Sequence, residues 1–394
     1  MVLIRPDTSV IYLGFGWISQ QQVMTYSSGI PLFIIGLLGG VLSIRKGLRT
    51  LLSDRSFLCF VVVSAFFSFL TIIMNPIWRN AAFTRLLSIT AAIAVYSTCS
   101  RLEAREFFRI ASISCGVIIA ANAIIAAHIY GQTIVHIGNL NEFQLSDSNY
   151  ASLPIIFGIS LALQYLGRGR LWRWDKVACS LSVVIMSWGI LLSASRGAQL
   201  STAVILVLWL TGFLFAPRTH FGTFKRMGVI AVVSISVFFM IGDIKSGIFK
   251  SNLSRWEEAI PSGGSNRVEI YTAALNEIKS KPLNVVIGGG IGHNLEVLGG
   301  RNAHNQILDS LFDYGILGVI CLIWFWIRLV SLRPLGIRGL NYHRESTTIA
   351  AVGLGVAALL LSPIWYTLFW IEIAYLAACT APEVNNHKRE AKKY

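Results

Sequence analysis

The residues with the clearest capacity for chemistry lie in Arg301–Ser310, where a polar segment turns strongly apolar within two helical turns. His304 stands at the start of this change, and Leu311–Gly318 continue the segment into a predicted membrane span. At a helix N-terminus the helix dipole disfavours the charged imidazolium, and a nearby arginine acts in the same direction. A neutral imidazole can accept a proton as a general base. The alternative is that His304 only caps the helix.

Three polar side chains continue this segment at intervals of four residues, namely Asn305, Asp309 and Asp313. This spacing places them on one stripe of a helix. Two carboxylates in the first turns of an apolar helix indicate a polar cavity or arginine partners. Alternatively, both acids complement the helix dipole at the membrane surface.

Two arginines are candidates for binding an anionic group such as a diphosphate, because a guanidinium can form two parallel hydrogen bonds to phosphate. Arg196 follows Ser195 between two apolar segments, and a charge close to the membrane interior is costly unless it has a function or extends to the surface. Arg267 opens a predicted amphipathic helix. The alternative for both is an ordinary charged loop residue.

Weaker candidates lie on the same predicted outer face. Arg79 and Arg85 come at the outer end of a predicted span, and Arg301 precedes His304 by one helical turn. Asn149 could form a hydrogen bond to a sugar, although capping the helix that follows it is the simpler explanation. The sequence has no DxD pair, no HExxH motif and no cysteine–histidine cluster, so we expect neither a metal ion nor a cofactor.

The elements that must hold these residues are membrane helices. Of the 394 residues 54% are hydrophobic and 13% are charged, whereas a soluble domain has about 25% charged residues. Apolar runs of about 18 residues suffice to cross a membrane. The predicted spans are 28–44, 56–74, 83–99, 110–129, 150–166, 177–193, 199–215, 227–242, 305–327, 347–362 and 364–380. We expect an all-α fold, a polytopic bundle of about twelve membrane helices, or eleven if the weaker segment 9–26 is not a span.

The net charge of +14 follows the predicted topology. Most of the 33 basic residues lie in alternate connections and in the C-terminal tail. The positive-inside rule places these segments in the cytoplasm, so the charge does not indicate a nucleic-acid partner. With twelve spans both termini are cytoplasmic, and the one long loop is external.

Four parts are therefore predicted: an N-terminal transmembrane bundle (1–242), a periplasmic loop (243–304), C-terminal transmembrane helices (305–380) and a basic cytoplasmic tail (381–394). In the loop, Asn266 and Glu269 resemble a capping box. An apolar stripe then recurs at helical spacing until Pro282, and consists of Val268, Tyr271, Leu275 and Ile278. This predicts an amphipathic helix over 267–280 lying against the bundle. The glycine-rich run 288–292 predicts a turn that brings backbone close to another group.

Three of these segments together resemble the O-antigen ligase / O-antigen polymerase superfamily of bacterial envelope glycosyltransferases. They are Ser195–Gly197, the stretch from Asn266 through Gly292, and His304–Gly318. Each motif is short, and their order and spacing carry the resemblance. It covers roughly 149–320, and the rest of the chain resembles the family in architecture only.

The resemblance implies a metal-independent glycosyltransferase in the bacterial inner membrane, with its active site facing the periplasm. Its donor would be a glycan linked to undecaprenyl diphosphate, held by Arg196 and Arg267, and His304 would activate the acceptor hydroxyl. The acceptor is lipid A–core in a ligase and another lipid-linked glycan in a polymerase, and both remain open. Protein O-glycosylating relatives carry larger external segments and fit less well. Membrane lipids are the other expected partner.

Two other classes of protein fit parts of the pattern. A lipid-linked glycan flippase would also be polytopic, but transporters often contain inverted repeats and helices interrupted near the midplane. We find no internal repeat, and the polar motifs gather on one face. A structural envelope protein would not need His304 beside several arginines. These points favour the transferase over the flippase and the structural protein.

Overall fold

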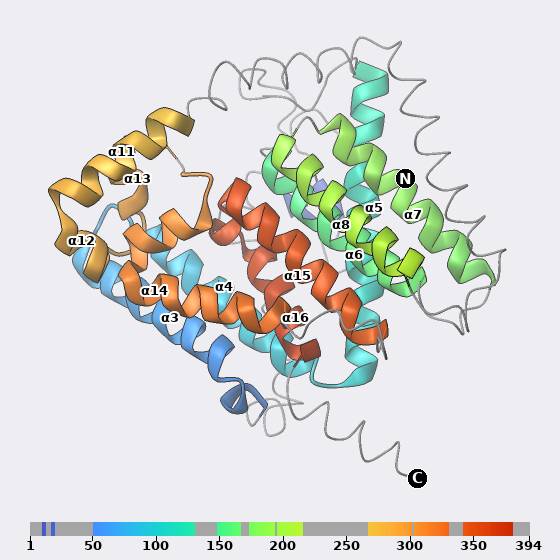
Figure 1. Ribbon diagram of the computed structural model, residues 1–394, viewed down its shortest axis with the longest axis horizontal. Helices are drawn as coiled ribbons and strands as arrows, with labels where there is room; N and C mark the ends of the chain where they lie inside the picture. The colour runs from blue at the N-terminus through green and yellow to red at the C-terminus, as the bar shows by residue number, and fades with distance from the viewer. Residues whose placement is uncertain are drawn as a thin grey trace. The chain divides into compact units, whose positions relative to one another are not determined.

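The computed structural model describes residues 10–12, 17–19, 50–130, 148–166, 173–193, 195–215, 267–301, 303–330 and 342–380. These residues form helices and their connections, apart from one short pair of strands, so the predicted helical class is confirmed (Figure 1). The chain divides into two compact units, each described by itself. Unit 1 comprises 1–21, 109–261 and 332–356, and unit 2 comprises 22–108, 262–331 and 357–394. Helices α5 (Leu102–Tyr130) and α15 (Tyr342–Leu361) contribute residues to both units.

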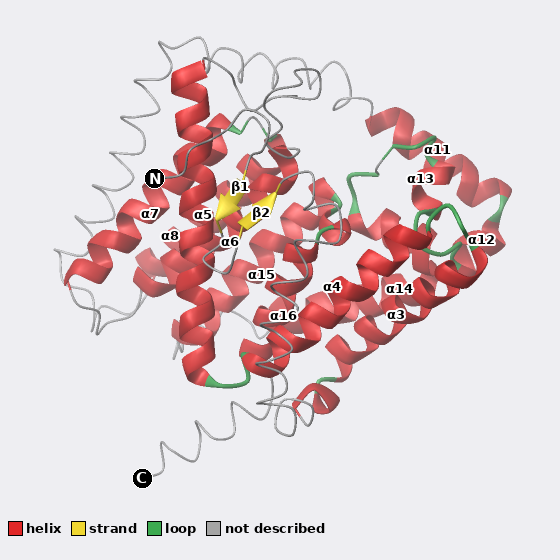
Figure 2. Cartoon of the chain, turned by 180° about the vertical axis from the view of Figure 1, so that it is seen from behind, coloured by secondary structure: helices red, strands yellow, loops and turns green. Residues whose placement is uncertain are grey.

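The weak candidate span over 9–26 contains strands where the structure describes it. Strand β1 (Val10–Tyr12) pairs antiparallel with β2 (Trp17–Ser19), with Ile11 opposite Ile18 (Figure 2). A helix over these six residues is therefore wrong. Their β-branched and aromatic side chains favour strands, and the sequence between them holds two glycines, which favour turns. The total number of spans stays a prediction.

Unit 1 is built around three helices: α6 (Ser148–Leu166), α7 (Arg173–Leu192) and α8 (Arg196–Phe215). Helix α6 packs against both α7 and α8. Small residues let the helices of this unit approach closely, since a Cβ on Gly189 would lie 2.6 Å from the Cβ of Ala120 in α5. Gly116 and Gly158 face the sulfur of Met186 in the same way. Small residues at interfaces are typical of membrane helices.

Unit 2 combines long helices with a segment of short helices, which we call the external segment because it belongs to the loop predicted to be external. Its long elements are α3 (Arg55–Met74), α4 (Arg79–Thr98), α14 (Gln306–Val330) and α16 (Thr367–Thr380), with the 3₁₀ turn η2 (Pro363–Trp365). Helix α3 packs on α4 and α14, and α4 packs on α16. Phe60 stacks on Phe325 and on Trp370, with ring centroids 5.6 and 5.1 Å apart. The external segment consists of α11 (Arg267–Ser280), α12 (Pro282–Ile287) and α13 (His293–Val297).

Four of the described helices are long and apolar enough to cross a membrane: Arg55–Met74, Arg79–Thr98, Trp174–Leu192 and Gln306–Val330. Four shorter helices are also apolar: Ser152–Leu166, Arg196–Thr211, Thr347–Leu361 and Thr367–Thr380. The protein is therefore a multi-pass membrane protein. The predicted spans 28–44 and 227–242, and the tail 381–394, lie outside the described residues. The four-part division and the sidedness stay predictions.

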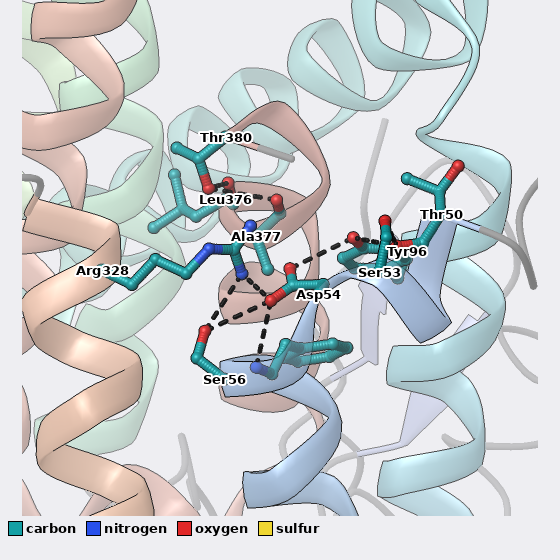
Figure 3. A network of polar contacts seen from close by, with 10 residues as sticks. Thr50, Ser53, Asp54, Ser56, Tyr96, Arg328, Leu376, Ala377 and Thr380 are labelled. Carbon is teal, nitrogen blue, oxygen red and sulfur yellow. Dashed lines mark hydrogen bonds and ion pairs between the residues drawn. The ribbon is translucent and has the colours of Figure 1, made fainter. Parts of the chain in front are cut away.

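A buried polar network joins helix ends in unit 2 (Figure 3). Asp54 caps α3 by accepting from the backbone N–H of Phe57 at 3.2 Å, and it accepts from the hydroxyl of Tyr96 at 3.1 Å. Arg328, in the last turn of α14, forms an ion pair with Asp54 and donates to Ser56 at 3.1 Å. A buried carboxylate is costly unless it is paired in this way. The network fixes α3, α4 and α14 at the end of α14 opposite to His304.

Candidate functional site

The cap of α14 belongs to Asn305, not to His304. The side-chain oxygen of Asn305 accepts from the backbone N–H groups of Ile307 at 3.0 Å and Leu308 at 3.4 Å, and the helix begins at Gln306. His304 precedes this cap, is partly exposed and has a left-handed backbone with φ 50°. The capping alternative for the histidine is therefore wrong. His304 thus lies just before a candidate membrane span, whose helix is capped by the next residue.

Asp309 and Asp313 are both buried inside unit 2. The side-chain amide of Asn294 donates to Asp309 at 2.7 Å, and the backbone N–H of Asn294 donates to Asp313 at 3.2 Å. The backbone N–H of Ala303, next to His304, also faces the Asp309 carboxylate. The two acids thus bind Asn294 in α13 and Ala303 just before α14, on either side of the turn that joins these helices. Their burial contradicts the alternative of dipole-complementing acids at the membrane surface.

The glycine-rich turn packs directly onto α14. Gly289 and Gly290 donate their backbone N–H groups to the carbonyls of Phe312 at 2.8 Å and Asp313 at 3.0 Å. A Cβ on Gly288 would collide with the backbone at Gly315, and the reverse also holds. Gly315 has φ 68° and interrupts α14 with a kink. The predicted close approach of this turn is confirmed, and α14 itself is the group approached.

Arg85 lies in the interior of unit 2, only 3% exposed. Its guanidinium donates to the hydroxyl of Tyr314 and stands 5.0 Å from the ring centroid of Trp365 and 5.7 Å from that of Trp370. Cation–π contacts of this kind stabilise a desolvated guanidinium. Arg85 also interacts electrostatically with Asp309. It is therefore the arginine partner that the acidic stripe predicted.

Arg267 begins α11 and is half-buried. Its guanidinium donates to the carbonyl of Leu360 at 3.0 Å, so it is not the fully solvated charge of the alternative reading. Two residues further, Ser362 has φ 53° and its hydroxyl faces Asp309. Among the described residues, His304 and Ser362 are the non-glycine residues with positive φ. Ser362 and the backbone of Ala303, the residue before His304, both face the Asp309 carboxylate, and Arg267 binds the chain two residues before Ser362.

The two remaining candidate arginines in unit 2, Arg79 and Arg301, lie at the surface. Arg301 forms an exposed ion pair with Glu269 at 3.2 Å, and Arg79 donates to the carbonyl of Ile72 at 3.0 Å. Exposed pairs of this kind contribute little to stability. Glu269 is thus engaged by Arg301, and its predicted capping partner Asn266 lies outside the described residues.

In unit 1, Asn149 and Ser195 come together beside Arg196. The hydroxyl of Ser195 donates to the side-chain oxygen of Asn149 at 2.7 Å and accepts from the backbone N–H of Ala198 at 3.3 Å, which caps α8. Arg196 is the first residue of that helix and is partly exposed. The hydrogen bond fixes the position from which the Arg196 side chain leaves the backbone.

Several residues of the site had no signal in the sequence. Asn294 and Ser362 bind to or face Asp309 from segments that sequence spacing does not connect with it. Glu296 accepts from the indole N–H of Trp78 at 2.6 Å and from Asn75 at 3.3 Å, and lies 3.4 Å from Nδ1 of His293. Such partners meet only through the tertiary fold.

The Glu296 carboxylate lies outside the membrane helices and has an altered pKa. Partial burial raises its pKa, but hydrogen bonds from Trp78, Asn75 and His293 outweigh burial and lower the pKa overall. The carboxylate is therefore ionised at neutral pH. It ties the α3–α4 connection to α13, next to the glycine-rich turn.

This arrangement can place a base and cations at the edge of a membrane. In the described part of the chain, no group of three or more histidine, cysteine, aspartate or glutamate side chains could hold a metal ion. The fold and site define a multi-pass helical membrane protein in which Arg85, Asn294 and the backbone beside His304 face a buried carboxylate. Residues 181–323 match the family described as O-antigen ligase. This match supports the predicted resemblance to the O-antigen ligase/polymerase superfamily over that part of the chain.

The matched region contains Arg196, Arg267 and His304 and ends within α14. It supports a role in processing glycans at a membrane. No curated protein matches the chain.

Proposed function

We propose that the protein transfers a glycan from undecaprenyl diphosphate to an acceptor hydroxyl, as a glycosyltransferase of the O-antigen ligase or polymerase type. The observation that carries the proposal is the backbone of His304, which is left-handed at the start of a candidate span and lies inside the matched region. A non-glycine residue keeps such a conformation only where its surroundings impose it, and such residues cluster at functional sites. The neighbouring residues are held in place, since the backbone N–H of Ala303 faces Asp309 and the side chain of Asn305 caps α14.

In the proposed reaction His304 accepts the proton of the acceptor hydroxyl as its oxygen attacks the anomeric carbon. The bond between that carbon and the diphosphate oxygen breaks, and undecaprenyl diphosphate leaves with the electron pair. Arg196 and Arg267 neutralise the charge that develops on the diphosphate. Direct displacement inverts the anomeric configuration. No metal ion or cofactor takes part.

The half-buried position of Arg267 supports its proposed role. Its guanidinium uses one nitrogen for the Leu360 carbonyl, and this bond orients the group while other N–H donors can face an anion. Arg85, Asn305 and Asp309 would support the site through their hydrogen bonds with Tyr314, with the first turn of α14 and with Asn294. Arg79, Arg301 and Asn149 would bind the glycan or add positive charge.

We place the reaction at the periplasmic face of the bacterial inner membrane, in the synthesis of lipopolysaccharide or another surface polysaccharide. The alternation of basic connections supports this orientation. The acceptor would be lipid A–core or a growing lipid-linked glycan.

The test is transfer by purified protein. Undecaprenyl-diphosphate glycan is incubated with the protein, with and without lipid A–core, and the products are separated by size. A single increase in the mass of lipid A–core identifies a ligase, and a ladder formed without it identifies a polymerase. No product from folded protein across several donors would contradict the transferase.

A lipid-linked glycan flippase is the second candidate, because the kink at Gly315 is of the kind that transporters use. However, the backbone of Val286–Gly288 packs directly against this kink, so packing within unit 2 accounts for it. Movement of fluorescent donor across proteoliposomes, without any new glycosidic bond, would favour the flippase.

A further inference from the structure

The external segment carries apolar side chains that the protein does not cover. On α12, Leu283 is 70% exposed, Ile287 64% and Val286 50%. On α11, Val268 is 58% and Leu275 55% exposed. Contiguous exposed apolar surface usually marks a site of interaction with a partner or with a membrane.

Helix α11 has a second apolar face, which packs in the interior of unit 2. Ile270 and Ala274 are buried and pack with Val285, Leu298 and Phe312. The sequence predicted instead that Val268 and Leu275 face the bundle, and this is wrong for both residues. The apolar stripe of the sequence is therefore divided between a face that packs inside unit 2 and a face that points away from it.

The uncovered surface continues onto a candidate membrane span. The backbone of Val286 and Ile287 touches α14 at Gly315, and the next two residues of α14, Ile316 and Leu317, are exposed. Gly315 lies nine residues after the start of α14, or about 14 Å along the helix axis. Helix α12 therefore lies beside the N-terminal part of a candidate membrane span, next to exposed apolar side chains of that span.

We propose that α12 and the uncovered face of α11 lie in the membrane interface, with lipid acyl chains covering Leu283, Val286 and Ile287. Amphipathic segments lie at this depth when one face is apolar and the flanks are basic. Lys279 and Lys281 are exposed beside the apolar residues. Lys281 forms an ion pair with Glu277 at 3.2 Å, and Lys279 can contact an anionic headgroup. Part of the segment predicted as a periplasmic loop is thus a membrane anchor.

This contact depends only on the surface of α11 and α12, so it holds whichever reaction the protein catalyses. The membrane contact also determines the depth of nearby candidate site residues. The anchor keeps Arg267, at the start of α11, and the turn before His304 at the level of lipid headgroups. A diphosphate attached to a lipid lies at the same level.

Site-directed spin labelling of the full chain in lipid nanodiscs tests the anchor. Cys59 and Cys379, the two cysteines that are not buried, are first replaced by serine. Single labels are then attached at Leu283→Cys and Ile287→Cys, with Leu317→Cys as the lipid control and Asn276→Cys, an exposed polar position on α11, as the water control. Collisions with oxygen report lipid, and collisions with a water-soluble nickel complex report water.

We expect the labels at 283 and 287 to resemble the label at 317, with oxygen collisions exceeding nickel collisions. Labels that resemble position 276 would overturn the proposal. Labels at 283 and 287 that are shielded from both reagents would also overturn it, because a protein would then cover this face. Tryptophan fluorescence of each variant verifies that the chain is folded.

Discussion

The Asn294 side chain donates to the Asp309 carboxylate at 2.7 Å. The bond joins α13 in the external segment to the first turns of a candidate membrane span. Because both side chains are fully buried, the bond is not weakened by solvent. The same carboxylate faces the backbone next to His304. The position of the histidine therefore depends on a residue that has no contact with the substrate in the proposed reaction.

Removing either partner should destabilise the protein. Asn294→Ala removes a hydrogen-bond donor from the buried Asp309 carboxylate, and we expect the free energy of unfolding to fall by about 1–3 kcal/mol. Asp309→Asn weakens the same bond, so the double variant should lose less than the sum of the two single variants. Thermal unfolding in detergent measures this. Ser310→Ala is the control, because this buried hydroxyl has no hydrogen-bond partner among the described residues and its removal should change little. Additive losses would mean that the two side chains are not coupled.

Alanine at Gly315 should disrupt the junction between α12 and α14. The new Cβ would meet the backbone of Val286 and Ile287, in addition to the cost of a backbone with φ 68° and ψ −168°, a conformation essentially restricted to glycine that costs other residues about 1–3 kcal/mol. Gly299→Ala is the control for a positive φ without a close approach, because Gly299 has φ 63° and a Cβ added there would meet no described atom within 4 Å. We expect a clearly larger fall in melting temperature for Gly315→Ala than for Gly299→Ala. Equal falls would show that the close approach contributes nothing.

The contribution of Glu296 to stability should depend on pH. Its pKa is lowered in the folded protein, because hydrogen bonds from Trp78, Asn75 and His293 outweigh partial burial. A carboxyl with a lowered folded-state pKa stabilises the protein above its unfolded-state pKa, about 4.3. This contribution is lost as the pH falls through the folded-state pKa. The difference in melting temperature between the wild type and Glu296→Gln should therefore be largest at neutral pH and shrink below about pH 4.

Trp78→Phe is the companion variant for this pH series. It removes the indole N–H, which donates to Glu296 at 2.6 Å, and keeps an aromatic ring against Gly292. It should reduce the pH-dependent difference between the glutamate and glutamine forms. A difference that stays constant from pH 7 to pH 4 would contradict a lowered pKa.

Lysine at Arg196 or Arg267 should weaken the proposed donor binding. Lysine keeps the charge but loses the planar fork that binds phosphate through two bonds. At Arg267 it also loses the geometry of the bond to Leu360. We expect the KM for the lipid-linked donor to rise about tenfold, equivalent to about 1.4 kcal/mol. Arg101→Lys, at an exposed position on another connection, is the control. An unchanged KM in both test variants would contradict the proposal that Arg196 and Arg267 bind the diphosphate.

The sequence predicted helices where local signals were strong. The helix over 267–280 is present over Arg267–Ser280, because Pro282 cannot continue it. The face of that helix was predicted less well. Val268 and Leu275 are exposed, whereas Ile270 and Ala274 are buried. Helical spacing identifies apolar faces, but it does not tell which of two apolar faces packs against the rest of the protein.

The site was predicted in part. The acidic stripe indicated that Asp309 has a polar surrounding, and Arg85 is one of its charged neighbours. Asn294 and Ser362 were not predicted, because a buried carboxylate recruits donors through tertiary contacts that spacing does not encode. The strand pair in 10–12 and 17–19 was missed because a hydropathy window does not separate apolar strands from helices.

The most direct test of the account is single-turnover transfer by purified protein carrying His304→Gln. Glutamine retains polar size but cannot act as a base, and a general base contributes about 10²–10⁴-fold to rate. We predict a fall of at least about 100-fold in the rate of glycan transfer, with donor binding and melting temperature close to those of the wild type. Transfer at the wild-type rate by the folded variant would contradict the account, because the proton of the acceptor hydroxyl would then leave by another group.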